Sequence, residues 1–169
     1  MIQLFNQHIK WVVQPFDCMK IFIGSDHAGF ETKEFIKNTR FSTINEDVEF
    51  IDAGTYTKNR CDYPDYAKKT VKLLKKHLPF RKTSKQNNFG ILICGTGFGM
   101  CMVANRYKKI RAVVCRNVDE AKISRQHNNA NILCLGERTT TKEEIIKIIN
   151  TFISTKYEGD RHNNRIKKF

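Results

Sequence analysis

Short apolar runs separated by amphipathic stretches follow one another along most of the chain. Five of these runs are rich in branched and aromatic side chains and are typical of strands buried in a parallel sheet. They are Lys20–Gly24, Val48–Asp52, Gly90–Cys94, Arg111–Cys115 and Asn131–Leu135. Because helical patterns separate them, we predict a single-domain α/β fold. This fold is a three-layer α/β/α sandwich around a Rossmann-like, five-stranded parallel sheet with right-handed crossovers.

The helices are predicted from capping residues and from apolar positions at helical spacing. Ser25 or Asp26 can cap a helix that runs to Asn38, and Pro64 suits the first turn of a helix that ends near His77. Further helices are expected at Met100–Tyr107, at Asp119–Gln126, after a cap at Thr140 or Thr141 through Ile153, and within the basic tail Lys156–Phe169.

The composition is that of a soluble globular domain. The chain has 169 residues, of which 40% are hydrophobic and 28% charged, so it can bury the core of one domain. No run approaches the ~18 apolar residues of a membrane span, and we expect no membrane association. The six cysteines form no CxxC pair, which indicates free thiols in a reducing compartment. We therefore expect a cytoplasmic protein with neither disulfides nor a metal site.

The chain is strongly basic, with a formal net charge of +13. Such a charge raises the question of a nucleic-acid partner, because lysine and arginine neutralise phosphates. The lysines at 68–76, however, share a helix-like stretch, and no aromatic side chains alternate with them to stack on bases. A solvated helical face explains these lysines better, and small phosphorylated substrates would also suit a basic surface.

Two segments stand outside the regular pattern. Residues 1–18 contain no clean strand and no signal-peptide core, so they form an N-terminal extension before a domain at 19–169. Three origins stay open for them: a short amphipathic extension, an organelle address of unusual composition, or an upstream product if translation starts at Met19. The second segment is a basic loop around 79–88 that is longer than most connections in α/β domains.

The stretch Gly90–Met100 is the centre of the predicted site. A buried strand here runs into a loop with three glycines, and the backbone N–H groups at the start of the next helix attract anions. Cys94 lies at the mouth of this loop, where thiolates are stabilised, so it is a candidate for proton transfer or nucleophilic chemistry. Alternatively, Cys94 is a small residue buried in the core at a strand end, and this segment alone does not decide between the two roles.

Other candidate groups follow the strands in the same way. Asp26 and His27 come after the first strand, and Tyr63 lies in the loop region after the second. The carboxyl ends of parallel strands share one edge of the sheet, and ligands of such folds bind there. We therefore expect these three residues and Cys94 to gather on one rim.

Five motifs, in order along the chain, resemble those of the ribose-5-phosphate isomerase B family. They read SDHAGFETK, DAGTYTKNRCDYPDYA, GILICGTGFGMCMVANRYKKIRAVVC, SRQHNNANILCLGER and YEGDRHNNRI, and they cover about Met19 to Ile166. The resemblance implies a cofactor-free isomerase that interconverts D-ribose 5-phosphate and D-ribulose 5-phosphate through an enediolate, in the non-oxidative branch of the pentose phosphate pathway. It also implies a homodimer, or a tetramer, with active sites at the subunit interface and the C-terminal tail packed on the partner.

The resemblance assigns the catalytic groups. Cys94 matches the base of the family's cysteine branch, because Met100 stands where another branch carries a glutamate. Thr96 matches the hydroxyl that moves a proton between the substrate oxygens. Asp26 is similar to an aspartate that assists on the sugar, and His127 matches the histidine that opens the furanose ring.

Further positions match substrate-binding residues of the family. The N–H groups of the glycine loop would hold the enediolate, one histidine and three arginines would hold the phosphate, and an asparagine would support the ring-opening histidine. The substrate-binding residues are His27, Tyr63, Gly95, Gly97, Phe98, Gly99, Asn105, Asn128, Arg138, Arg161 and Arg165. Departures from the family pattern at Cys61 and Asp160 remove no catalytic group.

Two alternative functions remain. Relatives that isomerise galactose or allose 6-phosphate share the glycine loop, and only the length of the pocket, which the sequence does not show, separates them from pentose phosphate isomerases. A basic nucleic-acid-binding protein on the same fold is less favoured, because this chain has the full set of catalytic side chains and arginines.

Overall fold

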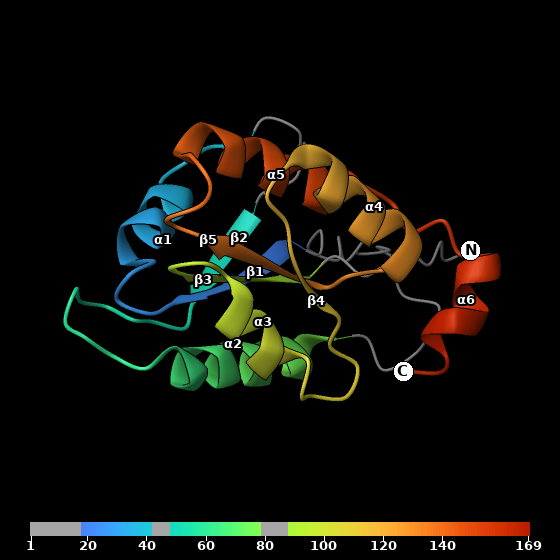
Figure 1. The fold of residues 1–169 in the computed structure, drawn as a ribbon, viewed down its shortest axis with the longest axis horizontal. Helices are drawn as coiled ribbons and strands as arrows, with labels where there is room; N and C mark the ends of the chain where they lie inside the picture. Colours follow the sequence, from blue (N-terminus) through green and yellow to red (C-terminus); the bar gives the residue numbers. More distant parts are fainter. Residues whose placement is uncertain (1–17, 42–47, 79–87) are drawn as a thin grey trace, which may run out of the picture.

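The computed structural model describes residues 18–41, 48–78 and 88–169, and a parallel sheet lies at its centre (Figure 1). The strands are β1 (Met19–Ser25), β2 (Val48–Asp52), β3 (Phe89–Cys94), β4 (Ala112–Val114) and β5 (Ile132–Gly136). They pair in the order β2-β1-β3-β5-β4, and every pair is parallel. The predicted α/β class and five-stranded parallel sheet are confirmed, and each strand end lies within about one residue of its predicted position.

Helices cover both faces of the sheet. They are α1 (Phe30–Lys37), α2 (Tyr63–His77), α3 (Phe98–Ala104), α4 (Val118–Asn128), α5 (Lys142–Ser154) and α6 (Arg161–Ile166). Figure 1 shows α1, α4 and α5 over one face, and α2 and α3 over the other. The short helix α6 contacts α4 at the end of the molecule, so part of the basic tail is helical.

Each face of the sheet has its own apolar core. Ile21 and Ile23 of β1 pack with Ile36 of α1 on one face, whereas Phe22 packs with Leu74 of α2 on the other. This alternation is the two-residue period of a strand that is buried on both sides. The core therefore holds β1 rigidly up to its last residue, where the loop toward α1 begins.

The start of α3 differs from the prediction. The helix begins at Phe98, two residues before the expected Met100, because Gly97 has a φ of 78° and serves as the N-cap residue. It also ends early, at Ala104. The next residue, Asn105, is the C-cap: its backbone N–H still donates to Cys101 O, and its side chain bonds the backbone of Ala112. The glycine loop is therefore shorter and tighter than its sequence indicates.

The caps of the other helices agree only in part with the predictions. Thr141 caps α5 through its hydroxyl, which accepts from Glu144 N–H, as expected for one of the two candidates. At α1 the prediction of a Ser25 or Asp26 cap is wrong, because Gly29 is the N-cap residue. Asp26 instead accepts hydrogen bonds within the turn that leads into the helix.

The predictions for the N-terminal extension and for the basic loop fall almost wholly outside the described residues. Within the described segments, none of the helices combines the length and the hydropathy that crossing a membrane requires.

Candidate active site

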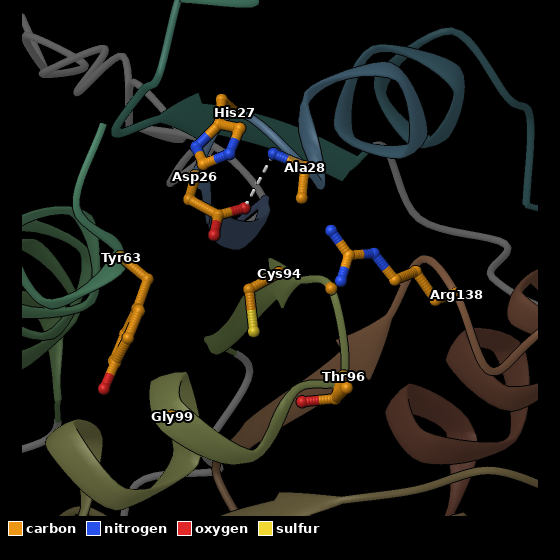
Figure 2. A pocket seen from close by; sticks show the side chains of 9 residues that line it. Asp26, His27, Ala28, Tyr63, Cys94, Thr96, Gly99 and Arg138 are labelled. Atoms are coloured by element: carbon orange, nitrogen blue, oxygen red, sulfur yellow. Dashed lines mark hydrogen bonds between the residues drawn. The ribbon is translucent and has the colours of Figure 1, made fainter. Parts of the chain in front are cut away.

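A pocket of about 230 Å³ lies at the carboxyl ends of β1 and β3 (Figure 2). Its lining residues are Asp26, His27, Ala28, Tyr63, Cys94, Gly95, Thr96, Gly99 and Arg138. The four residues that were expected to share one rim therefore do so. The sheet register explains the convergence, because Ser25 of β1 pairs with Ile93 of β3, and Cys94 pairs with Gly136 of β5.

Cys94 is the last residue of β3 and is only 5% exposed. Its Sγ accepts a hydrogen bond of 3.1 Å from the backbone N–H of Gly97. The left-handed conformation of Gly97 turns the chain back so that this N–H points at the sulfur. This hydrogen bond holds the sulfur in place at the wall of the pocket.

Gly99 is needed because Tyr63 approaches it closely. A Cβ at Gly99 would lie 2.6 Å from Cζ of the Tyr63 ring, so no other residue fits without moving the tyrosine. Tyr63 is the first residue of α2, and Figure 2 shows its ring forming a side wall of the pocket. The contact fixes the distance between α2 and the glycine loop.

Asp26 is held by the turn between β1 and α1. Its Oδ1 accepts hydrogen bonds from the N–H groups of Ala28 and Gly29, at 3.0 and 3.1 Å, and its own N–H donates to Ile93 O. These bonds orient a carboxylate that is 6% exposed, and the second oxygen is left for the pocket. A negative group at this place suits hydroxyls of a sugar rather than a phosphate.

His27 is oriented by the backbone of Cys61. Its Nδ1 lies 3.2 Å from Cys61 N and 3.1 Å from Cys61 O. In either tautomer the Cys61 backbone therefore occupies Nδ1, and a ligand in the pocket would meet Nε2. The side chain of Cys61 is thus less important than its backbone, which any small residue could provide.

Arg138 follows β5 and reaches over the glycine loop. Its N–H donates to Gly95 O at 3.0 Å, and a Cβ at Gly95 would lie 3.3 Å from the guanidinium carbon of Arg138. The neighbouring Glu137 accepts a hydrogen bond from the buried Thr32 of α1. No pattern in the sequence predicts this link, which ties the loop of Arg138 to helix α1.

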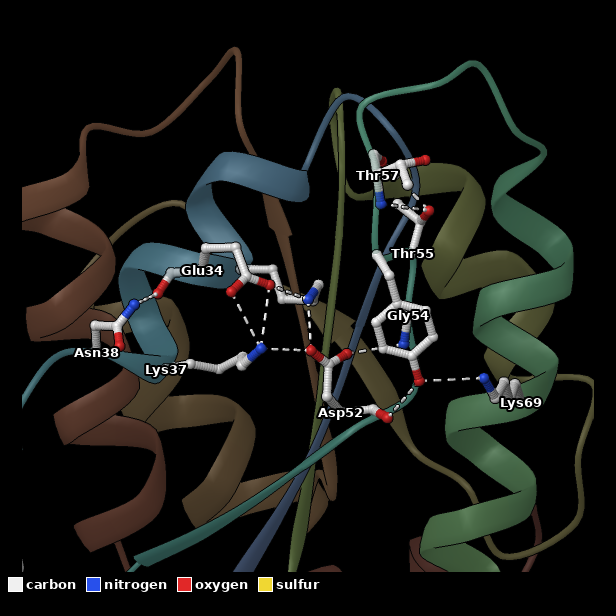
Figure 3. A network of polar contacts seen from close by, with 10 residues as sticks. Glu34, Lys37, Asn38, Asp52, Gly54, Thr55, Thr57 and Lys69 are labelled. Atoms are coloured by element: carbon white, nitrogen blue, oxygen red, sulfur yellow. Dashed lines mark hydrogen bonds and ion pairs between the residues drawn. The ribbon is translucent and has the colours of Figure 1, made fainter.

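A second unpredicted support lies at the end of β2 (Figure 3). Asp52 accepts from Lys33, which is fully buried, and from Lys37, both at 2.6 Å, and from Gly54 N–H at 2.8 Å. Burial alone would raise the pKa of Asp52, but the hydrogen bonds from both lysines and from Gly54 outweigh burial and lower it. The network fixes the loop whose Gly54 carbonyl accepts from Ser25 N–H, just before Asp26.

Several predicted site residues lie elsewhere. His127 and Asn128 end α4, and Arg161 and Arg165 belong to α6. A crossover helix runs antiparallel to the strands, so the end of α4 lies at the amino edge of the sheet, opposite the pocket. Figure 1 shows α4 ending beside α6, at the far end of the molecule from α1.

Two further predicted contacts have other partners within the chain. The side-chain amide of Asn105 donates to Ala112 O and accepts from Ala112 N–H, at 2.9 Å each. Phe98 is 43% exposed, and the guanidinium of Arg116 lies 5.1 Å from the centre of its ring. Neither side chain lines the pocket.

The fold and the pocket define an α/β protein with a thiol, a carboxylate and an arginine around a small polar cavity. A family model described as Ribose/Galactose Isomerase matches residues 21–169. The chain is 38% identical over 147 residues, 87% of its length and 91% of the relative's, to ribose-5-phosphate isomerase B of Escherichia coli (strain K12).

Two solved structures extend the comparison. A ribose 5-phosphate isomerase from Thermotoga maritima has a TM-score of 0.77 at 47% identity, and the match covers 89% of this chain and 96% of that one. Ribose-5-phosphate isomerase B from Mycoplasma genitalium, with bound ribulose-5-phosphate, has a TM-score of 0.76 at 40% identity and coverages of 88% and 92%. The chain belongs to the ribose/galactose isomerase family, which confirms the resemblance seen in its motifs.

Proposed function

We propose that this chain interconverts D-ribose 5-phosphate and D-ribulose 5-phosphate. The observation that supports this most directly is the position of the Cys94 thiol, in the pocket wall and facing the Gly97 N–H at 3.1 Å. The relative from Mycoplasma genitalium, at 40% identity, was crystallised with the ketose of this pair. A base beside a set of backbone donors is the arrangement that an enediolate mechanism requires.

In this mechanism Cys94 removes the C2 proton of the open-chain aldose, and the electron pair moves toward the C1 carbonyl to form an enediolate. Thr96, which lines the same pocket, transfers a proton between O2 and O1. The Cys94 thiol then returns its proton to C1, which completes the ketose. Backbone N–H groups of Gly95, Phe98 and Gly99 stabilise the enediolate charge, and loss of one such donor typically costs ~3 kcal/mol of barrier. The Gly97 N–H, which was expected among these donors, donates to Cys94 Sγ instead.

The remaining groups bind the substrate. His27 and Arg138, which line the same pocket, bind the phosphate or the sugar oxygens. Asp26 accepts hydrogen bonds from sugar hydroxyls. Each step is a proton transfer between side chain and substrate, so the reaction itself requires no cofactor. We keep the cytoplasm as the expected compartment, from the cysteine pattern.

A complete site requires a second copy of the chain. A five-residue strand such as β5 spans roughly 16 Å, so His127, Arg161 and Arg165 cannot reach the pocket of their own chain. In a homodimer the amino edge of one sheet can face the carboxyl edge of the other. The tail helix α6, which carries both arginines, then lies against the partner's pocket.

A coupled aldose–ketose assay on purified protein tests the proposal. We expect ribose 5-phosphate to be turned over faster than galactose or allose 6-phosphate. The family is named for galactose as well as ribose, so a hexose phosphate is the second candidate substrate, and faster turnover of a hexose phosphate would overturn our choice. No isomerase activity, together with RNA binding that persists at physiological salt, would favour a nucleic-acid-binding protein instead.

A further inference from the structure

A carboxylate from the tail lies beside the two histidines at the end of α4. Glu158 Oε2 lies 3.8 Å from Nε2 of His127 and 3.9 Å from Nε2 of His162. The two imidazole rings are stacked, with their centres 4.4 Å apart and their planes inclined by 12°. The three side chains thus form one cluster, although Glu158 and His127 are 31 positions apart in the sequence.

The backbone around Glu158 is fixed to both helices. Glu158 N–H donates to Gln126 O of α4 at 3.1 Å, and the preceding Tyr157 bonds Asn163 of α6 through its hydroxyl at 3.1 Å. The carboxylate itself is 47% exposed and His127 is 37% exposed, so both can meet a ligand or a second chain. His162 is buried behind them.

The charges around the two rings differ. Arg161 Nε and Arg165 Nη1 each lie 3.4 Å from a nitrogen of His162. Burial, and then repulsion from His127 and the two arginines, lowers the pKa of His162. His162 is therefore a neutral ring against which His127 stacks. A positive charge on His127 has Glu158 as its neighbouring carboxylate.

We propose that Glu158 is a positioning residue for His127: its carboxylate orients the imidazole and stabilises it when it carries the proton exchanged during opening of the sugar ring. This inference rests on the proposed function and on the ring-opening role of His127. The proton that opens the ring passes between His127 and the sugar oxygens, and Glu158 acts only through His127.

The same three groups are a less suitable metal site. Imidazole lone pairs lie in the ring planes, and two stacked rings whose centres are 4.4 Å apart and whose planes are inclined by only 12° do not direct their lone pairs at one ion. Both nitrogens of His162 also face a guanidinium at 3.4 Å, which repels a cation. The cluster suits the handling of a proton better than the binding of a metal ion.

The chemistry of the two substrates separates ring opening from the isomerisation step. Ribose 5-phosphate exists mainly as a closed furanose. Ribulose 5-phosphate cannot close, because its 5-hydroxyl is esterified with phosphate. Exchange of the C1 proton of ribulose 5-phosphate into D2O, followed by NMR, therefore measures the Cys94 step without any ring opening.

For Glu158→Gln we expect turnover of ribose 5-phosphate to fall by about three- to fivefold, the upper range for one partly exposed ion pair, while C1 exchange from ribulose 5-phosphate stays unchanged. Glu158→Asp keeps the charge and should recover part of the loss. The matched control is Glu49→Gln, which removes a carboxylate of similar exposure paired with Lys20 at 3.3 Å. It should change neither rate.

Equal losses in both assays would show a merely structural role and overturn the inference, as would unchanged turnover of ribose 5-phosphate. Failure of the proposed function looks different, because the wild-type protein would then catalyse neither the turnover nor the exchange.

Discussion

The two edges of the sheet hold their functional side chains in different ways. At the carboxyl edge, Asp26, Cys94 and Arg138 lie at or just beyond strand ends, and backbone hydrogen bonds between neighbouring strands fix them, such as Asp26 N–H to Ile93 O and Arg138 N–H to Gly95 O. At the amino edge, His127 and Glu158 meet through a ring stack and through side-chain charges on partly exposed groups, and a single backbone bond, from Glu158 N–H to Gln126 O, joins their segments.

This difference indicates a division of labour. The proton transfer between carbon atoms needs a base in a fixed place, and the rigid sheet provides it. Under the proposed function, ring opening and part of the phosphate binding fall to side chains of the amino edge, which include the partly exposed His127. Under the proposed function each chain would contribute to two shared sites, and variants at either edge of the sheet should separate the two contributions.

Replacement of the base should have the largest effect. In Cys94→Ala we expect turnover to fall by about 100- to 10,000-fold in both directions, because a positioned general base contributes that much. Circular dichroism and size-exclusion chromatography should show an unchanged fold and oligomer. The control is Cys115→Ala, since burial raises the pKa of Cys115 to about 12 and this thiol cannot serve as a base at neutral pH. Wild-type turnover in Cys94→Ala would disprove the assignment.

Mixing two inactive variants tests whether a site is shared between chains. Pure dimers of Cys94→Ala and pure dimers of His127→Ala should each fail to turn over ribose 5-phosphate. After joint refolding, each mixed dimer regains one site with both wild-type groups. About a quarter of wild-type activity should return, because half of the dimers are mixed and half of their sites are restored. If each chain holds a complete site, no activity will return.

The arginine of the pocket should affect binding more than chemistry. In Arg138→Lys we expect KM for ribose 5-phosphate to rise by about tenfold, since lysine keeps the charge but loses the planar fork, and a charge-assisted hydrogen bond contributes about 1.5–3 kcal/mol. Steady-state kinetics measure this, with Arg116→Lys as the control at a guanidinium that lies over Phe98 outside the pocket. A large fall in kcat with unchanged KM would contradict a binding role.

The smallest effect on activity is expected for the support at the end of β2. In the folded state the pKa of Asp52 lies below its ordinary value of 3.8. The ionised carboxylate therefore stabilises the fold above pH 3.8, and this stabilisation is lost as the pH falls through the pKa of Asp52 in the folded state. In Asp52→Asn we expect urea unfolding at neutral pH to show a loss of about 1–3 kcal/mol, with a shallower decline of stability below about pH 4. Glu49→Gln, at an exposed ion pair, should behave like wild type. An unchanged acid profile in Asp52→Asn would show that the network does not stabilise the fold.

Much of the fold and of the pocket was predictable from the sequence, for a local reason. A strand buried on both faces has a continuous apolar run, and polar residues directly after such runs must lie at the carboxyl edge. Asp26, His27 and Cys94 each follow or end such a run, so their common edge can be predicted from the sequence alone. Sequence motifs then connect the chain with its family, and through it with a substrate.

Local pattern could not show contacts between residues far apart in the chain. The link from Thr32 to Glu137, the burial of Lys33 beneath Asp52 and the approach of Glu158 to His127 each join separate segments. In sequence these look like ordinary polar residues of helices and loops, and only the packing of the elements brings each pair together.

The sequence by itself determined the order of the elements, the edge of the sheet that holds Cys94, and the family. The tertiary structure decided the conformation of the glycine loop, where Gly97 at a φ of 78° directs its N–H to Cys94, and the separation of His127 from that cysteine. The physical reason is the same in both cases. Periodicity reports which face of an element is buried, whereas the direction of a single N–H group or the distance between two sheet edges depends on how all the elements pack.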